Sequence, residues 1–312
     1  ASLTGAGNPL GEDRQGRAEW AKDLSIKPFA EGMELLYFTG CYYSYDPRLK
    51  KVAQATAAIL KKAGVDFGIL GAKENCCGES IRKTGHEDLF KRLAKENIKT
   101  FIDNGVKKIV VSSPHCYHTF KNEYPEFMFH LDVVHISQFL LELVEGGRLE
   151  LNGASAGHDG DGDKGARTRR VTFHDPCYLG RHNGIFDEPR QLLQKLVGLE
   201  LVEMPDTLED SLCCGGGGGR IWAETPKEER FSDLRVEQAV EVGAEVLATS
   251  CPYCISNFEE SRLALGEGAP EVKDITEILV EALNGGGGPA VERLGESATD
   301  GPGGQSGNGG TP

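Results

Sequence analysis

The stretch SLCCGGGGGRIWAE, residues 211–224, places two adjacent cysteines directly before five glycines. A disulfide between Cys213 and Cys214 is disfavoured, because neighbouring Cα atoms lie about 3.8 Å apart, whereas bridged cysteines usually need at least about 4.4 Å. The pair must therefore serve another purpose. The same three residues, Cys-Cys-Gly, occur a second time at positions 76–78.

Both cysteine pairs belong to an internal repeat. A single cysteine, the pair and a further cysteine follow one another in the same order in each half, displaced by 135 to 137 positions. A duplication is the simplest cause of this pattern. The first copy contains Cys41, Cys76, Cys77 and Cys116, and the second contains Cys177, Cys213, Cys214 and Cys251, followed by Cys254.

Strand-like and helix-like segments alternate within each copy. Apolar runs precede the cysteines, amphipathic helical patterns lie between them, and each copy closes with a similar helical pattern, VVHISQFLLELV at 133–144 and VKDITEILVEAL at 272–283. This alternation predicts an α/β fold with two duplicated βαβ-type domains, each a small parallel sheet flanked by helices. The expected strands lie at 33–41, 67–70 and 107–113 in the first copy and at 169–177, 199–204 and 245–251 in the second.

Composition also divides the chain into domains and connecting segments. Small and polar residues dominate the start, the segment between the copies and the end, and such sequences cannot build a core. We therefore expect a linker or docking arm (1–32), a first domain (33–147), a flexible linker (148–169), a second domain (170–284) and a disordered tail (285–312).

Overall composition excludes several functional classes. With 39% hydrophobic and 26% charged residues the chain is typical of soluble globular proteins, and it contains neither the run of about 20 apolar residues of a membrane helix nor a signal peptide. A net charge of −14 argues against nucleic acid as a partner. Nine cysteines without a secretion signal predict a cytoplasmic protein whose thiols are metal ligands or redox groups.

The cysteines of each copy follow the ends of its predicted strands. Because the carboxyl ends of parallel strands meet at one edge of a sheet, the thiols of one copy can converge there. The second copy supplies five thiols in a one, two, two arrangement. This number fits the four-coordinate tetrahedron of zinc poorly and suits an iron-sulfur cluster.

Other residues near these cysteines also favour an anionic cofactor. Gly215 and Gly216 allow the backbone to approach closely and to present N–H groups, Arg220 can add positive charge, and His174 can supply hydrogen bonds or protons. A phosphate-binding loop would need a Gly-Lys-Ser or Gly-Lys-Thr sequence that is absent. A thioredoxin-like dithiol would account only for CPYC, and buried structural cysteines would leave the duplication unexplained.

The first copy differs at one position. Thr119 stands where the second copy has its fifth cysteine, so four thiols remain, with His115 and His118 nearby as substitutes. A histidine beside such a motif is more often a hydrogen-bonding or packing residue than a ligand. Cluster binding by the first copy stays open on the sequence.

These motifs resemble the duplicated cysteine-rich "CCG" domain of heterodisulfide reductase catalytic subunits and related (Fe-S)-binding oxidoreductases. The similarity extends over residues 7–283 and includes SPHCYHTFKNEYP, HDPCYLGRHNGIFDEPR and CCGGGGGRIW. It implies a non-cubane [4Fe-4S] cluster in the second copy, whereas Thr119 argues against a second cluster of this type in the first. The implied ligands are Cys177, Cys213, Cys214, Cys251 and Cys254.

The resemblance also implies partners. In many members of the family a ferredoxin-like domain with two cubane clusters, sometimes after a membrane heme-binding domain, precedes a stretch similar to residues 7–24. Because the chain starts at Ala1 and lacks the ferredoxin motif, we expect the C-terminal portion of a longer protein, or a subunit fed by a separate ferredoxin. Either arrangement would place it peripherally on the inner face of a membrane.

Three functions follow as hypotheses. The first is electron transfer through the second-copy cluster, between a soluble donor such as an electron-transfer flavoprotein or ferredoxin and a membrane quinone module. The second is reduction of a disulfide substrate at that cluster, as the resemblance to heterodisulfide reductase implies. The third is a zinc-stabilised scaffold without catalytic activity.

Overall fold

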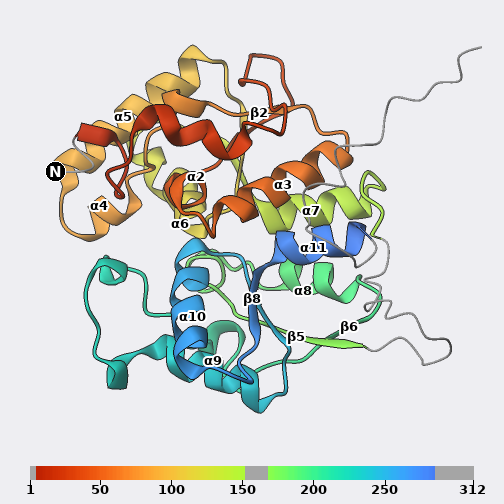
Figure 1. Cartoon of the computed structure of the whole chain (residues 1–312). Helices are drawn as coiled ribbons and strands as arrows, with labels where there is room; N and C mark the ends of the chain where they lie inside the picture. The colour runs from red at the N-terminus through yellow and green to blue at the C-terminus, as the bar shows by residue number, and fades with distance from the viewer. Residues whose placement is uncertain (1–4, 152–167, 285–312) are drawn as a thin grey trace, which may run out of the picture.

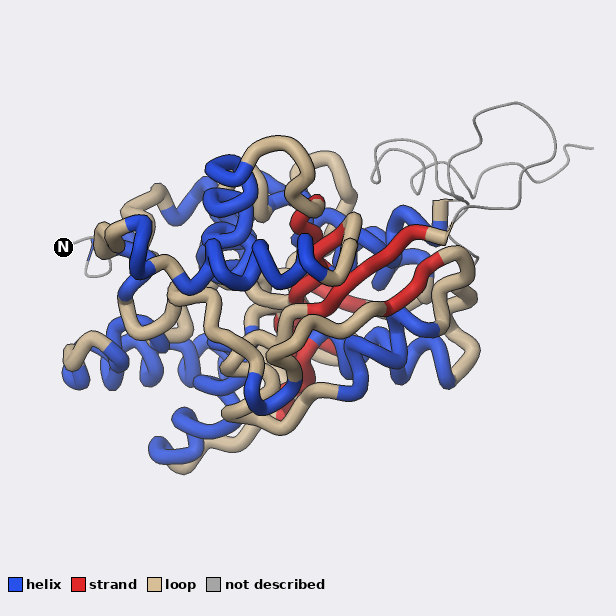
Figure 2. Tube along the Cα trace, turned by 90° about the horizontal axis from the view of Figure 1, so that it is seen from below, coloured by secondary structure: helices blue, strands red, loops and turns tan. Residues whose placement is uncertain are grey.

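Two four-stranded parallel sheets, one in each repeat, form the centre of the molecule (Figure 1). The structure is a computed structural model that describes residues 5–151 and 168–284. The sheets have the same strand order, β2-β1-β3-β4 and β6-β5-β7-β8, and helices surround them (Figure 2). This confirms the predicted fold class. The expected tail at 285–312 lies outside the described residues, as does most of the expected linker at 148–169.

The central strands are buried because helices cover both faces of each sheet. In β1 and β7 every residue is buried, as expected for apolar strands in a parallel α/β sheet. The strands are β1 (Leu35–Phe38), β2 (Phe67–Gly68), β3 (Lys108–Val111), β4 (Asp132–His135), β5 (Arg169–Phe173), β6 (Leu199–Leu201), β7 (Val246–Thr249) and β8 (Glu271–Asp274).

The fourth strand of each sheet corrects our sequence prediction. We expected 133–144 and 272–283 to be helical throughout, but β4 pairs with β3 and β8 pairs with β7. Each strand ends at a residue whose side chain caps the following helix: His135 accepts from the Ser137 amide and Asp274 from the Thr276 amide. The strands are too short for their period to be separated from the helical pattern that follows.

The helices connect the strands and join the two repeats. Helix α3 packs on α11, and α7 packs on α8, so each repeat contributes one helix to each pair. The α-helices are α2 (Cys41–Tyr45), α3 (Lys50–Lys62), α4 (Glu79–Lys83), α5 (Glu87–Asp103), α6 (Pro114–His118), α7 (Ile136–Glu145), α8 (Asp187–Gln194), α9 (Phe231–Glu241), α10 (Pro252–Leu265) and α11 (Ile275–Leu283). Short 3-10 segments include η1 (Arg14–Ala21) and η6 (Arg220–Trp222).

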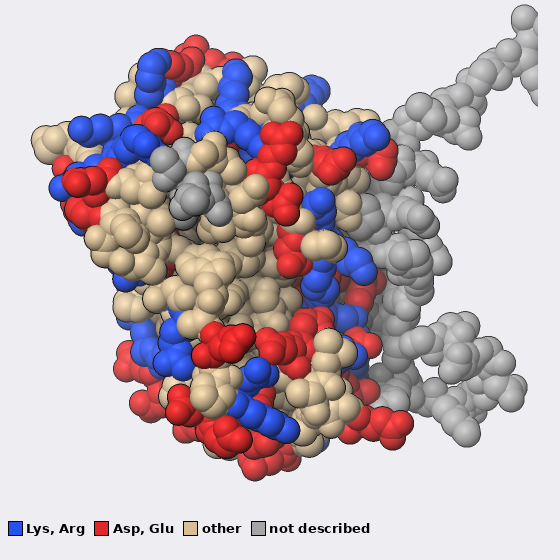
Figure 3. Space-filling view, turned by 60° about the vertical axis from the view of Figure 1, so that its left-hand side comes forward, with Lys and Arg blue, Asp and Glu red and all other residues tan. Residues whose placement is uncertain are grey.

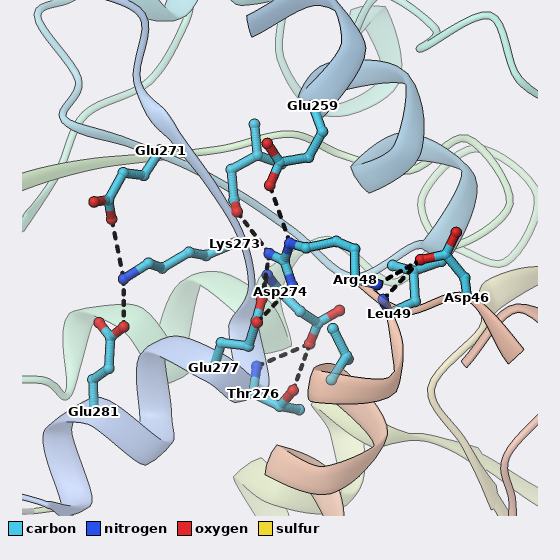
Figure 4. Close-up of polar contacts among 12 residues, drawn as sticks. Asp46, Arg48, Leu49, Glu259, Glu271, Lys273, Asp274, Thr276, Glu277 and Glu281 are labelled. Carbon is cyan, nitrogen blue, oxygen red and sulfur yellow. Dashed lines mark hydrogen bonds and ion pairs between the residues drawn. The ribbon is translucent and has the colours of Figure 1, made fainter. Parts of the chain in front are cut away.

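Polar contacts reinforce the packing between the repeats (Figure 4). The Arg48 guanidinium, from the first repeat, donates to Glu259 on α10 at 3.0 Å and to Glu277 on α11 at 2.7 Å. It also donates to the Val272 carbonyl. One hydrophobic cluster contains core residues of both repeats, so the two sheets are parts of one continuous core.

The N-terminal segment is packed against the first repeat, where we expected a linker or docking arm. Trp20 is buried and lies edge-on to Tyr37 of β1, with ring centroids 6.0 Å apart. The Arg17 side chain is also buried and forms an ion pair with Glu74 at 2.9 Å. Residues 5–32 therefore form part of the folded unit. No helix in the described ranges is both long and apolar enough to cross a membrane.

Candidate metal centre

Five thiols of the second repeat come together at the carboxyl end of its sheet, as the sequence predicts. Cys177 follows β5, and the Cys213–Cys214 pair follows β6. After β7, Cys251 is the N-cap of α10 and Cys254 lies in its first turn. Hydrogen-bond contacts connect neighbouring thiols in the order Cys177, Cys213, Cys214, Cys254, Cys251, and the Sγ atoms of Cys214 and Cys254 lie 3.3 Å apart. We call these five residues the second thiol set.

Two members of the second thiol set favour the thiolate form. Hydrogen bonds from Cys177 and then Cys214 lower the pKa of Cys213 far below its ordinary value. Burial raises the pKa of Cys251, but hydrogen bonds from Cys254 and His115 outweigh it and bring the pKa to about 5. Contacts with neighbouring thiols, together with burial, raise the pKa of Cys177 and Cys214, and burial, together with such contacts, raises the pKa of Cys254. Thiolates are the form that binds metal, so two of the five thiols are already in the binding form.

The glycine run brings the backbone close to the second thiol set. The Gly215 N–H points at the Cys213 Sγ at 3.4 Å, and its φ is +83°. A Cβ on Gly216 would lie 3.1 Å from the Tyr253 Cβ and from the Asn257 Nδ2. Asn257 also donates to the Cys214 carbonyl at 2.8 Å. The two glycines therefore let this loop pack directly on α10.

His174 and Arg220 occupy different surroundings. His174 is completely buried at the end of β5, and its Nδ1 accepts a hydrogen bond from the Arg235 Nε at 3.2 Å. Arg220 is exposed and lines an open cavity of about 680 Å³ that Cys214 and Gly215 also line. The structure thus brings His174 into the interior of the site and leaves Arg220 at its rim.

Sequence reasoning missed Arg235. This arginine lies on α9 and is completely buried. A signal was present in the sequence, because Ser232, Arg235, Val236 and Ala239 share the helical spacing of a buried face. An arginine in the middle of such a face needs buried partners.

The four thiols of the first repeat also converge, and we call them the first thiol set. Hydrogen-bond contacts connect Cys41, Cys76, Cys77 and Cys116 in that order. The Gly78 N–H points at the Cys76 Sγ at 3.4 Å, which repeats the geometry of Gly215 and Cys213. Contacts with neighbouring thiols, together with burial, raise the pKa of Cys41 and of Cys77 well above the ordinary thiol value.

Thr119 and the two histidines of the first repeat have distinct roles. Thr119 is completely buried, and within the described ranges its hydroxyl has no hydrogen-bond partner. The hydrogen bonds of His118 go to Asn122 and Asn183. His115 pairs with Glu79 at 3.2 Å and bonds the Cys251 thiol of the other repeat. Neither histidine bonds a thiol of the first set, which speaks against their substituting for the fifth cysteine.

The N-terminal segment reaches the first thiol set, which we did not foresee. The Arg17 Nη2 lies 3.3 Å from the Cys41 Sγ, and the Cys76 amide donates to the Gly7 carbonyl at 2.9 Å. Pro9 lines the same narrow pocket as the four thiols. Sequence reasoning placed these residues outside the first domain, because their polar and glycine-rich composition gives no periodic pattern.

The two thiol sets lie on facing sides of the contact between the repeats. Pro252 and Tyr253 of α10 line the pocket of the first set. The Tyr253 hydroxyl bonds Ser80 at 2.7 Å, and its ring lies 4.4 Å from that of His115. Figure 3 shows one face of the molecule, on which charged side chains border a band with few charges. Residues that line the two sites are therefore in direct contact across the two repeats.

Chemically, the second thiol set fits a polynuclear cofactor. Its five soft donors form an extended row. The Gly215 N–H and the buried His174 add donors beside the thiols. Soft thiolates with surrounding N–H groups are the environment of iron-sulfur clusters.

Comparison with known proteins agrees with this chemistry. The family model of a cysteine-rich domain, CCG, matches residues 35–121 and 171–259. The chain is 39% identical to a probable iron-sulfur-binding oxidoreductase, FadF, of Bacillus subtilis, covering 91% of this chain and 40% of that protein. It is 35% identical to EtfAB:quinone oxidoreductase of Syntrophomonas wolfei, covering 88% and 39%.

A third relative is one of the polypeptides of dihydromethanophenazine:CoB--CoM heterodisulfide reductase of Methanosarcina barkeri. It is 32% identical over 88% of this chain and 65% of that polypeptide. The chain therefore spans about two fifths of the length of the first two relatives and about two thirds of the third. All three names describe oxidoreductases.

Proposed function

The chain belongs to the cysteine-rich CCG domain family, and from this premise we propose that it is an iron-sulfur electron-transfer module. Cys177, Cys213, Cys214, Cys251 and Cys254 would hold a non-cubane [4Fe-4S] cluster, which supplies reversible one-electron chemistry when bound. The observation that carries the proposal is the continuous row of five buried or half-buried thiols at the carboxyl end of the second sheet.

The surrounding residues would control how the cluster is held. The Gly215 N–H stabilises the Cys213 thiolate, and Asn257 fixes the Cys214 carbonyl against α10. His115, from the first repeat, donates to Cys251. Hydrogen bonds to cluster sulfurs and to their cysteine ligands stabilise the more negative, reduced state.

We propose that the electrons pass between a soluble donor, an electron-transfer flavoprotein or ferredoxin, and a quinone-linked membrane partner. The support is the similarity to EtfAB:quinone oxidoreductase and to the FadF protein. Because the chain spans about two fifths of these relatives, a ferredoxin-like domain or subunit would complete the path.

A disulfide reductase is the second candidate. The similarity to the heterodisulfide reductase polypeptide favours it, and so does the open cavity of about 680 Å³ that reaches Cys214. Reduction of small disulfides by the cluster-loaded protein above the background rate would favour this candidate over pure electron transfer.

The decisive test is the iron and acid-labile sulfide content of the anaerobically purified chain, with electron paramagnetic resonance on the same samples. We expect about four iron and four sulfide per chain, and loss or change of the signal in Cys254→Ser. The matched variant Cys116→Ser, in the first repeat, should keep the second-repeat signal. About eight of each would mean that the first repeat also binds a cluster. Zinc without sulfide would contradict the proposal and leave the scaffold hypothesis.

A further inference from the structure

Arg235 carries a buried positive charge without a carboxylate partner. Its side chain is completely buried, and its hydrogen bonds go to neutral acceptors: the His174 Nδ1, the Asp206 carbonyl, the Gln238 side-chain oxygen and the Ser211 hydroxyl. Within the described ranges no Asp or Glu oxygen lies at ion-pair distance from it, and the carboxylates of Asp175, Asp206 and Glu203 attract it only at longer range. Burial lowers the pKa of Arg235 to about 10, which leaves it protonated at neutral pH.

The other buried arginines show that this arrangement is unusual. Arg17 has Glu74 at 2.9 Å, and Arg190 has Asp175 at 2.6 Å. Buried charges in proteins are almost always paired, because an unpaired one has a large desolvation cost. Arg235 has no such direct partner, and its Nη2 donates to the Ser211 hydroxyl at 3.2 Å, two residues before Cys213 of the second thiol set.

Arg235 also fixes the tautomer of His174. A guanidinium nitrogen can only donate, so the His174 Nδ1 must be the acceptor and the ring proton must sit on Nε2. Because the Nδ1 accepts this hydrogen bond, it carries no proton, and the ring is the neutral imidazole.

The Nε2–H of His174 has no acceptor. The atom is buried, and no hydrogen-bond partner for it exists in the described parts of the chain. A buried donor without an acceptor is unfavourable, because it has lost its hydrogen bonds to water, so such a donor points to a ligand. His174 lies three residues before Cys177, and Arg235 bonds both His174 and Ser211, two residues before Cys213. The ligand that fits is therefore the cofactor of the second thiol set.

We infer that Arg235 and His174 form a relay, an inference that rests on the proposed second-repeat cluster. Arg235 orients the imidazole, and His174 donates its Nε2–H to a cluster or thiolate sulfur. Arg235 is the positioning residue, and His174 touches the cofactor. The relay stabilises the reduced, more negative cluster and so raises its reduction potential. In the first repeat, by contrast, Arg17 is neutralised by Glu74 and His115 by Glu79.

The test is a potentiometric titration of the full, cluster-loaded chain, followed by electron paramagnetic resonance. Arg235→Met and His174→Leu should each lower the ratio of reduced to oxidised cluster about tenfold at the midpoint potential of the wild type. For a one-electron couple this equals a midpoint potential that is lower by about 59 mV. His174→Gln keeps an amide acceptor and donor, and Arg235→Lys keeps the charge, so both should restore part of the shift. Arg170→Met is the matched control: it removes one positive charge from the same repeat, at the opposite end of β5.

A second measurement does not depend on any variant. Histidine-selective ¹⁵N NMR of the wild-type chain should show His174 with its proton on Nε2. A proton on Nδ1, or an unchanged potential in Arg235→Met with full iron content, would overturn the relay while leaving the proposed function intact. A wild-type chain without iron and sulfide would overturn the proposed function itself, and the relay with it.

Discussion

The glycines in the run after Cys214 differ in whether a residue with a Cβ could replace them. Gly219 has φ +85°, and a Cβ there would lie 2.8 Å from the Thr84 Cγ2 of the first repeat. Gly217 has an ordinary backbone conformation and no neighbour within 4 Å of an added Cβ. Only one of the two positions therefore needs glycine.

We expect Gly219→Ala to lower the free energy of unfolding by about 1–3 kcal/mol, because it combines left-handed backbone strain with a close contact between the repeats. Gly217→Ala, its control, should change it by less than about 0.5 kcal/mol. Urea unfolding of the two variants measures the difference. Equal effects would show that Gly219 is not held in the left-handed conformation.

At the same scale, the sequence predicts the thiols of the site but not their partners. Cysteines at a repeated spacing predict convergence, because strand ends meet at one edge of a parallel sheet. His174 could be singled out by its place beside Cys177. Arg235 could not be assigned to the site, because only the docking of α9 brings it to His174. Arg17 lies in a segment without periodicity, and its contact with Cys41 depends on tertiary packing.

At the scale of elements, the junction between β8 and α11 contains a buried acid. Asp274 caps α11 by accepting from the Thr276 amide at 2.9 Å, and its Oδ2 is buried without a partner in the described ranges. Burial raises the pKa of Asp274 from 3.8 to about 7. At a pH between these two values, the Asp274 carboxyl is therefore protonated in the folded protein and ionised in the unfolded chain.

The raised pKa of Asp274 makes the folded protein less stable as the pH rises. Stability from a raised pKa is fully present below the unfolded value and is lost as pH rises through the folded value. We expect the free energy of unfolding to fall between about pH 4 and pH 7, and Asp274→Asn to remove part of that slope while keeping an oxygen for the Thr276 amide. Urea unfolding across this range tests the prediction. A constant difference between variant and wild type would show that Asp274 ionises normally.

The same junctions explain why the fold was only partly predictable. Alternating apolar runs and amphipathic segments predict three strands and the main helices of each repeat. In β4 and β8, four residues precede a strongly amphipathic helix, and the helical pattern dominates any window that contains both. Pairing with β3 and β7, which selects the strand conformation, is a tertiary interaction.

At the scale of the whole molecule, function depends on how the two repeats are held together. The proposed cluster ligand Cys251 receives a hydrogen bond from His115, and Tyr253 of α10 bonds Ser80. Both contacts cross between the repeats. Residues of the other repeat therefore cover part of each thiol set. Separation of the repeats would expose both sets.

Arg48 is the polar contact that best tests this dependence. Its guanidinium bonds Glu259 and Glu277 of the other repeat, and these three side chains are between 14% and 29% exposed. We expect Arg48→Met to lower the free energy of unfolding by about 2–4 kcal/mol, because it leaves the half-buried Glu277 without its counter-charge. Glu259 keeps a second partner, Arg262, at 3.2 Å. The exposed pair of Arg148 and Glu34 lies within the first repeat, so Arg148→Met should cost less than about 1 kcal/mol.

Thiol accessibility separates loosening of the repeats from a general loss of stability. In the cluster-free chain, Arg48→Met should speed alkylation of the buried cysteines under native conditions more than Arg148→Met does, since opening between the repeats uncovers both thiol sets. If Arg48→Met lowers stability but leaves the alkylation rates at the wild-type level, the repeats open only on global unfolding, and the hydrophobic core that they share is sufficient to keep the two sites closed.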